Sequence, residues 1–340
     1  MSTLRHPSRL LAIDGVAVSI VFLVMLGYFS VASPAFLTGD NIYNTFVESI
    51  STVLLAAGLT FVLISGGIDL SIGSTIGLSA AATLFVAMTG ASTLMAVLAG
   101  LVTGLVIGTI NGAFVAGAGV SDFIVTLATL SIGAGLLKVF TGRTQLTGTD
   151  NASFLALAEG RILGIPTGVF IAAVVLVVLE VILVKTPFGR AVYATGVNAN
   201  AAFLAGVSVR RIRFSVFVIS GVVAGIGGVL LASHLNSVQP GLGGGYELTA
   251  IAGCVVGGVS LAGGRGSIWR AALGAFFLSV LSRGLQLIGV DPLWFSIVTG
   301  AAIVAAVAFD RGAQRWLQSS PRPARALKTA ADASTAQNAH

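Results

Sequence analysis

Long uncharged apolar stretches recur along the chain, and each is about as long as a membrane-spanning helix. A helix needs about 20 apolar residues to cross the hydrocarbon core of a bilayer. These stretches are continuously apolar, whereas the strands of a membrane β-barrel alternate with a period of two. We identify about ten of them, at 11–33, 47–65, 71–90, 92–118, 121–140, 163–184, 214–233, 248–263, 267–288 and 292–309. The chain is therefore predicted to be an all-α, polytopic transmembrane helical bundle of about ten spans.

The scarcity of charge supports this fold class. Only 9% of the 340 residues are charged, against about 25% in an ordinary soluble domain. Too few charges are available to cover a water-soluble globule, and the chain is too hydrophobic to be disordered. A disulfide scaffold is excluded because the single cysteine is Cys254.

The positions of lysine and arginine predict the orientation. Of the 18 basic residues, twelve lie in three segments, namely Arg5 and Arg9, then Lys185, Arg190, Arg210, Arg211 and Arg213, then Arg311, Arg315, Arg322, Arg325 and Lys328. Even numbers of predicted spans separate these segments, so all three can face the cytoplasm, as the positive-inside rule requires. Both termini are then cytoplasmic. Nucleic-acid binding is disfavoured because the basic residues are dispersed and lack interleaved aromatic residues.

This topology divides the chain into three parts. Residues 1–10 form a cytoplasmic N-terminus, 11–310 a single transmembrane domain, and 311–340 a cytoplasmic tail that we expect to be partly disordered. The first span is interpreted as an uncleaved anchor rather than a signal peptide, since it is long and further spans follow. The predicted outer loops are 34–46, 141–162, 234–247 and a short turn at 289–291.

The motifs of an enzyme or a built-in motor are absent from the sequence. No Gly-Lys pair is present, so a P-loop is excluded. One cysteine and three distant histidines predict no metal site, and we expect neither catalytic residues nor a cofactor on this chain. Ion-coupled carriers bury ionisable groups as relays. The candidates for such groups, which we interpret as interfacial or locally paired charges, are Asp69, Lys138, Glu180 and Arg283.

The cytoplasmic loop 185–213 contains helix start and stop signals. Thr186 can cap a helix, and Pro187 suits the first helical position. Gly196 is expected to end this helix in the left-handed conformation. The loop therefore predicts a first short helix close to the membrane.

A second short helix is predicted directly after the first. Asn198 or Asn200 can cap it, and it is expected to end near Gly206. Two such helices would form a rigid knob that a separate motor protein could grip. The alternative is a basic loop that only sets the topology.

Several polar residues and glycines within or beside the spans are candidates for the solute path. Gly66–Ser74 is interpreted as a cytoplasmic turn in which Asp69 or Ser71 caps the next span; a helix break that lines the path is the alternative. Asn111 can bind a sugar hydroxyl, although an interhelical hydrogen bond is the favoured interpretation. The candidates for the path or a helix break are Gly66, Gly67, Asp69, Ser71, Asn111 and Arg283.

The cytoplasmic loop 185–213 resembles the cytoplasmic coupling segment of ABC sugar-importer permeases of the ribose/xylose/galactose type. That family typically shows T-x-F-G-R-x-x-Y-A-x-G-x-N-x-x-A-A-x-x-x-G-I. The matching residues are Thr186, Phe188, Gly189, Arg190, Tyr193, Ala194, Gly196, Asn198, Ala201, Ala202 and Gly206. Further segments are similar to the same family in the same order, at 66–74, 111–112, 123–127, 246–252 and 257–264.

The chain departs from the family pattern at four places. Val197 and Ala199 interrupt the usual Gly-Gly-Asn-Pro, Asp122 stands where proline is usual, and Gly253 stands where alanine is usual. Arg283 lies near a position where the family has asparagine. The arginine is the departure expected to bear on the substrate, because a charge within a span is costly without a role or a partner.

The resemblance implies a permease subunit of a bacterial ABC importer in the cytoplasmic (inner) membrane, carrying a monosaccharide or a similar small polar solute. It implies a second permease subunit, expected to be another copy of this chain, and a cytoplasmic ATPase that binds ATP and magnesium. It also implies a periplasmic or lipid-anchored solute-binding protein, for which 141–162 and 234–247 would form the docking surface. Two alternatives remain open: an ABC permease for a nucleoside, amino acid or signalling molecule, and an ion-coupled secondary carrier.

Overall fold

The computed structural model describes residues 8–291, 294, 297, 300 and 301, and most of them are helical. The long helices are α1 (Ser8–Ala32), α2 (Gly39–Ile64), α4 (Thr93–Gly112) with its π-helical continuation η1 (Ala113–Gly117), α5 (Asp122–Phe140), α7 (Thr167–Lys185), α10 (Val209–Leu235) and α12 (Ile268–Leu287). The shorter helices are α3 (Ile72–Met88), α6 (Ala152–Glu159), α8 (Pro187–Val197), α9 (Ala199–Leu204) and α11 (Tyr246–Val256). The prediction of a helical membrane protein is confirmed.

Within the described residues, six helices are long and apolar enough to cross a membrane: α2, α4 with η1, α5, α7, α10 and α12. Shorter apolar helical segments occupy three further predicted spans: Ile20–Ala32 within α1, α3 (Ile72–Met88) and α11 (Tyr246–Val256). Most of the predicted span 292–309, and the tail after it, lie outside the described residues. The count of ten spans and the cytoplasmic termini therefore stay predictions.

Two predicted span boundaries differ most from the structure. The second span begins at Gly39 rather than at residue 47, because Thr38 caps α2 and the polar residues of its first turns are held by hydrogen bonds. The eighth ends at Val256 rather than at residue 263, because Gly257 and Gly258 form a turn in which Gly258 has a φ of +79°. Hydropathy alone detects neither a polar helical extension nor an apolar turn.

Helices α2 and α10 form the centre of the bundle. In the most apolar stretch of each, 94% of α2 and 67% of α10 is buried, against 17% of α5. α2 packs on α10, α7, α11 and α12, and α10 packs on α3 and α4 as well. The exposed apolar faces of α4, α5 and α7 are the ones available to lipid.

Glycines bring α4 into close contact with α10. Gly100, Gly104 and Gly108 recur every four residues on α4, and a Cβ on Gly104 or Gly108 would collide with the α10 backbone at Gly221 or Phe217. Gly221 on α10 is equally close to α4. This is the small-residue packing that lets membrane helices approach each other at backbone distance.

Two non-helical segments enter the bundle from opposite ends. Residues 65–71 join α2 to α3 at the end where α8 lies, because Gly196 of α8 packs on Ile64. Residues 236–245 join α10 to α11 at the other end and bring the carbonyls of Leu242 and Gly243 against the first turns of α3. These two segments shorten α3 and α11.

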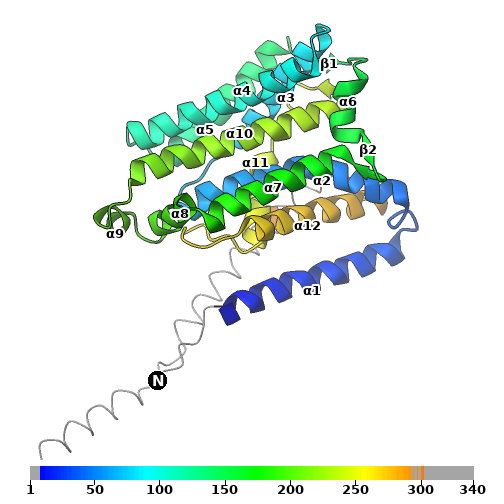
Figure 1. The fold of residues 1–340 in the computed structure, drawn as a ribbon. Helices are drawn as coiled ribbons and strands as arrows, with labels where there is room; N and C mark the ends of the chain where they lie inside the picture. Colours follow the sequence, from blue (N-terminus) through cyan, green and yellow to red (C-terminus); the bar gives the residue numbers. More distant parts are fainter. Residues whose placement is uncertain (1–7, 292–293, 295–296, 298–299, 302–340) are drawn as a thin grey trace, which may run out of the picture. The chain divides into compact units, whose positions relative to one another are not determined.

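Short strands tie together the loops at the end opposite α8. β1 (Leu146–Thr147) pairs antiparallel with β4 (Ser237–Val238), and β2 (Arg161–Ile162) pairs with β3 (Ile165–Pro166). The first pair joins the predicted outer loops 141–162 and 234–247, so they form one surface. In Figure 1, α8 and α9 lie at one end of these helices, and β1, β2 and α6 lie at the other.

Candidate functional site

The loop between α7 and α10 folds into two short capped helices, α8 and α9. Thr186 Oγ1 accepts a hydrogen bond from the Gly189 amide at 3.2 Å, and Pro187 occupies the start of α8. Asn198 Oδ1 accepts from the Ala201 amide at 3.0 Å and caps α9. Gly206, with a φ of +87°, follows the end of α9. The predicted pair of helices and these capping residues are confirmed, with Asn198 rather than Asn200 as the second cap.

The predicted role of Gly196 is wrong. It does not end α8 in the left-handed conformation, since α8 continues through Val197 and Asn198 is its C-cap. Gly196 is needed instead for close packing, because a Cβ there would collide with the Ile64 carbonyl and approach the Gly264 amide to 2.6 Å. The contact is between residues far apart in the sequence, so helix-stop rules could not detect it.

Helix α8 is seated firmly on the end of α2. Val192 is fully buried, and the ring centroids of Phe188 and Phe61 lie 6.3 Å apart. Tyr193 Oη donates a hydrogen bond to the Gly266 carbonyl at 2.8 Å. Burial, with a smaller contribution from Glu180, raises the pKa of Tyr193, so the phenol stays protonated as this donor.

The loop before α12 is bound to the same place. The Gly264 amide donates to the Ile64 carbonyl at 2.8 Å. A displacement of α8 would therefore reach both α2 and the loop that leads into α12.

The surface of α8 and α9 that faces away from the bundle is mainly apolar and carries one arginine. Arg190 is exposed, and Val197, Phe203 and Leu204 are 73%, 69% and 84% exposed. Of the remaining predicted positions, Ala202 is buried, Ala194 is half-buried and Ala201 is exposed. Helices α8 and α9 thus have one face that packs on the bundle and a second, exposed face, which we call the free face.

The segment 65–71 has features of both a turn and a helix break. Gly66, with a φ of +84°, turns the chain beside Gly263 and Gly196 at the α8 end. Asp69, only 1% exposed, lies against Ser220 near the middle of α10. The favoured interpretation, a turn confined to the inner end, is therefore incomplete, because the extended residues after the turn run into the helix bundle.

Asp69, Ser71 and Asn111 belong to one hydrogen-bond network. Asp69 Oδ1 accepts from the Ser71 amide at 3.0 Å and from Ser71 Oγ at 2.6 Å, and its Oδ2 accepts from Ser220 Oγ at 2.8 Å. Asn111 Nδ2 donates to Ser71 Oγ at 2.7 Å, and Thr129 Oγ1 donates to Asn111 Oδ1 at 2.6 Å. The network joins α3, α4, α5 and α10, and Asn111 makes the interhelical contacts that were favoured for it.

Gly66 and Gly67 lie beside a small cavity of about 150 Å³ at the α8 end. Asp122 also lines this cavity and accepts a hydrogen bond from the Ile68 amide at 2.6 Å through Oδ2. The residue that replaces the family's usual proline thus holds the broken segment in place. Asp69 and Asn111 do not line the cavity.

Arg283 lies away from this network, at the opposite end of the bundle. Its Nε donates to Asn41 Oδ1 at 2.8 Å, and its Nη1 lies 3.3 Å from Glu48 Oε1 and from Gln286 Oε1. The guanidinium therefore ties α12 to the first turns of α2. The predicted path residues form two separate groups rather than one.

Sequence reasoning missed two partners in these contacts, namely Ser220 and Thr129. Ser220 and Thr129 carry no local signal, since isolated hydroxyl residues are common in apolar helices. Glu180 accepts from the Ile268 amide at 3.1 Å, so its carboxylate lies at the positive N-terminus of α12. This contact agrees with the interpretation of Glu180 as a locally paired charge. Within the described residues, no group of three His, Cys, Asp or Glu side chains could hold a metal ion.

Comparison with known proteins gives concordant results. The family described as "Branched-chain amino acid transport system / permease component" matches residues 41–307. The ribose import permease protein RbsC of Bacillus subtilis is 38% identical over 283 residues, which cover 83% of this chain and 88% of that protein. The D-allose transport system permease protein AlsC of Escherichia coli is 34% identical, with 86% and 90% covered.

A third relative, the galactose/methyl galactoside import permease protein MglC of Escherichia coli, is 35% identical over 331 residues, covering 91% of this chain and 98% of that protein. No solved structure matches. The family match spans most of the chain, and each relative is covered over nearly its whole length. The chain therefore belongs to the family of branched-chain amino acid transport system permease components.

Proposed function

We propose that this chain is the membrane-spanning subunit of an ATP-driven ABC importer for a monosaccharide. The relatives are named for ribose, allose and galactose import. The structural observation that supports the proposal is the packing of α8 on the end of α2. It provides an element that a separate ATPase can move and a direct mechanical connection from that element to the helices at the centre of the bundle.

The ATPase would bind the free face of α8 and α9 from the cytoplasm. Val197, Phe203 and Leu204 supply apolar area there, and Arg190 supplies positive charge. ATP and magnesium would bind to that partner. Closure of the ATPase would push α8 and so shift the end of α2 and the loop before α12, switching the path between outward-open and inward-open states.

The remaining partners follow from the same arrangement. A second copy of this chain would complete the pore in the cytoplasmic membrane of a bacterium. The surface formed by the loops 141–162 and 234–247 would receive an extracytoplasmic binding protein that delivers the solute. The joining of these loops through β1 and β4 supports a single docking surface.

An ABC permease for a non-sugar solute is the second candidate. The family description names branched-chain amino acids, and this observation favours it. An ion-coupled carrier is the third. It is less well supported, because Asp69, Glu180 and Arg283 all hold helices together through the contacts described above.

The coupling role is tested by charge substitutions at two exposed leucines. Leu204→Glu on α9 is expected to abolish co-purification of the ATPase with the permease, because it places a carboxylate in the apolar contact. Leu163→Glu is the control, since Leu163 is 96% exposed at the opposite end of the bundle. Retention of the ATPase by the Leu204→Glu variant, at the level of the control, would contradict the proposal.

A further inference from the structure

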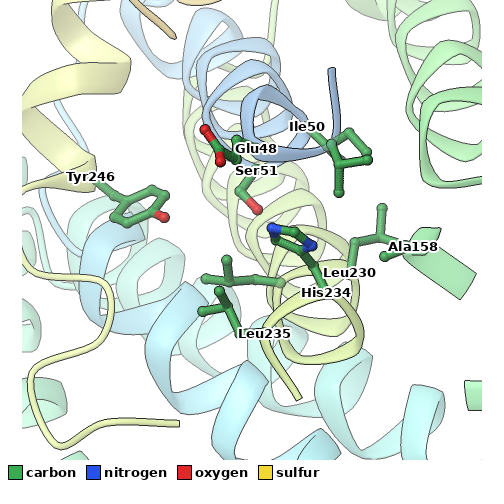
Figure 2. A pocket seen from close by; sticks show the side chains of 10 residues that line it. Glu48, Ile50, Ser51, Ala158, Leu230, His234, Leu235 and Tyr246 are labelled. Atoms are coloured by element: carbon green, nitrogen blue, oxygen red, sulfur yellow. The ribbon is translucent and has the colours of Figure 1, made fainter. Parts of the chain in front are cut away.

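The end of the bundle opposite α8 contains a cavity of about 210 Å³. It lies between the outer part of α2, the last turns of α10, α6 and the first residue of α11 (Figure 2). Glu48 and Ser51 come from α2, His234 from α10 and Tyr246 from α11. Leu230, Leu231 and Ile50 supply apolar walls. We call this cavity the outer pocket.

Two hydroxyl groups in the outer pocket have no hydrogen-bond partner among the described residues. Ser51 is only 3% exposed, yet its Oγ makes no hydrogen bond to any residue in the described part of the chain. The same holds for Oη of Tyr246, again within the described residues. Neither oxygen is fully enclosed by protein, so each can pair with water or with a solute in the cavity.

Two polar side chains around the outer pocket already contact neighbouring residues. His234 Nδ1 lies 2.9 Å from Glu159 Oε1, and Glu48 Oε1 lies 3.3 Å from Arg283 Nη1. Figure 2 shows the Ser51 hydroxyl directed toward the His234 ring, with Tyr246 facing them from α11. The pocket therefore presents hydroxyls, an imidazole and a carboxylate that is paired with Arg283.

This combination fits a neutral molecule with several hydroxyl groups. Serine and tyrosine hydroxyls both donate and accept, and a carboxylate accepts, so together they can pair with hydroxyls in any orientation. The leucine walls and the tyrosine ring suit the C–H faces of a sugar. The volume is below the range of about 300–1,000 Å³ typical of drug-sized ligands, which favours a small solute.

We infer that the outer pocket binds a neutral polyol of monosaccharide size as it enters the permease. The inference rests on the proposed function and names the solute site within it. Its place beside the loops 141–162 and 234–247 puts it next to the surface proposed to receive the binding protein. Arg283 then acts as a positioning residue, since it contacts Glu48 rather than lining the pocket.

Cysteine labelling tests the pocket independently of transport. The native Cys254 is fully buried, so its background reaction is expected to be low. Ser51→Cys in membranes should react with a small hydrophilic thiosulfonate at least about ten times faster than Ser49→Cys. Ser49 is the matched control because it is equally buried on α2, outside the pocket, and its hydroxyl donates to the Phe46 carbonyl.

Protection by solutes decides what the pocket binds. D-ribose, D-allose or D-galactose at millimolar concentration should slow the labelling of Ser51→Cys, while L-leucine should not. Equal labelling of the two cysteine variants, protection by L-leucine alone, or protection by none of these solutes would overturn the inference.

Uptake measurements provide a second test with hydroxyl-deleting variants. Ser51→Ala should raise the KM for the sugar that the importer carries by about tenfold, the equivalent of one lost hydrogen bond, and leave the amount of protein in the membrane unchanged. Ser49→Ala should leave the KM unchanged. Identical KM values for the two variants would contradict the pocket while leaving the proposed function intact. Sugar protection without any ATP-driven uptake would contradict the proposed function and retain the pocket.

Discussion

The polar network around Asp69 and the polar groups of the outer pocket differ in whether they are satisfied within the protein. In the network, the Asp69 carboxylate, the Ser71 hydroxyl and the Asn111 amide all pair with neighbouring side chains. In the outer pocket, the hydroxyls of Ser51 and Tyr246 have no partner among the described residues. The comparison teaches that polar groups in an apolar helical bundle serve two purposes, namely to lock helices together or to receive a solute. Substitutions in the two regions should therefore affect different quantities.

The largest effect on stability is expected for Asp69→Ala. The substitution removes the acceptor of three hydrogen bonds and leaves buried donors on Ser71 and Ser220 without a partner. Each unsatisfied group costs about 1–3 kcal/mol, so the free energy of unfolding should fall by about 3 kcal/mol or more. Reversible unfolding in mixed micelles measures it, and a loss below about 1 kcal/mol would show that the network does not lock the helices.

Asn111→Ala should have the next largest effect. It removes the connection between Ser71 on the α3 side and Thr129 on α5. We expect the free energy of unfolding to decrease by about 1–3 kcal/mol. The sugar KM, measured in the intact importer, should stay unchanged, because Asn111 does not line the outer pocket. A raised KM with an unchanged free energy of unfolding would show that Asn111 contacts the solute instead.

Thr129→Val is a nearly isosteric test at the edge of the network. Its hydroxyl donates one hydrogen bond to Asn111, and that acceptor would be left unpaired. A decrease of about 1 kcal/mol in the free energy of unfolding is expected. Additivity with Asn111→Ala would argue against a shared network, since residues in contact couple in double-mutant cycles.

Tyr246→Phe should have the smallest effect on stability and a clear effect on transport. The hydroxyl has no partner within the described residues, so its removal should change the free energy of unfolding by no more than about 0.5 kcal/mol. The KM for the sugar should rise by about tenfold. Tyr28→Phe, on the exposed face of α1, serves as the control. A stability loss as large as that of Thr129→Val would place Tyr246 among the structural residues instead.

Much of the fold follows from the sequence because the bilayer restricts the options. Long apolar stretches must form helices, because lipid offers their backbone groups no hydrogen-bond partner. Most of the predicted spans that lie within the described residues are helical. The caps at Thr186 and Asn198 were also predictable, since a cap depends on residues within one turn. The polar start of α2 and the early end of α11 were not, because hydropathy averages over the residues that decide a boundary.

The tertiary contacts were beyond sequence reasoning. Only glycine fits at position 196 beside the Ile64 carbonyl. Arg283 is held by Asn41 and Glu48, and Asp69 accepts a hydrogen bond from Ser220 of α10. Each pair is separated by many residues and lies on different helices. The outer pocket gave no signal for the same reason, since its polar residues come from three separate segments.

The central claim is that the chain moves a sugar with energy supplied by a separate ATPase. Proteoliposomes that contain the permease alone, or the permease with its ATPase and binding protein, test it most directly through uptake of labelled D-ribose, D-allose and D-galactose. The account predicts uptake of at least one sugar only when the ATPase, the binding protein and ATP are all present, with no uptake driven by a proton or sodium gradient. Gradient-driven uptake by the permease alone, or no sugar uptake by the complete assembly, would contradict it.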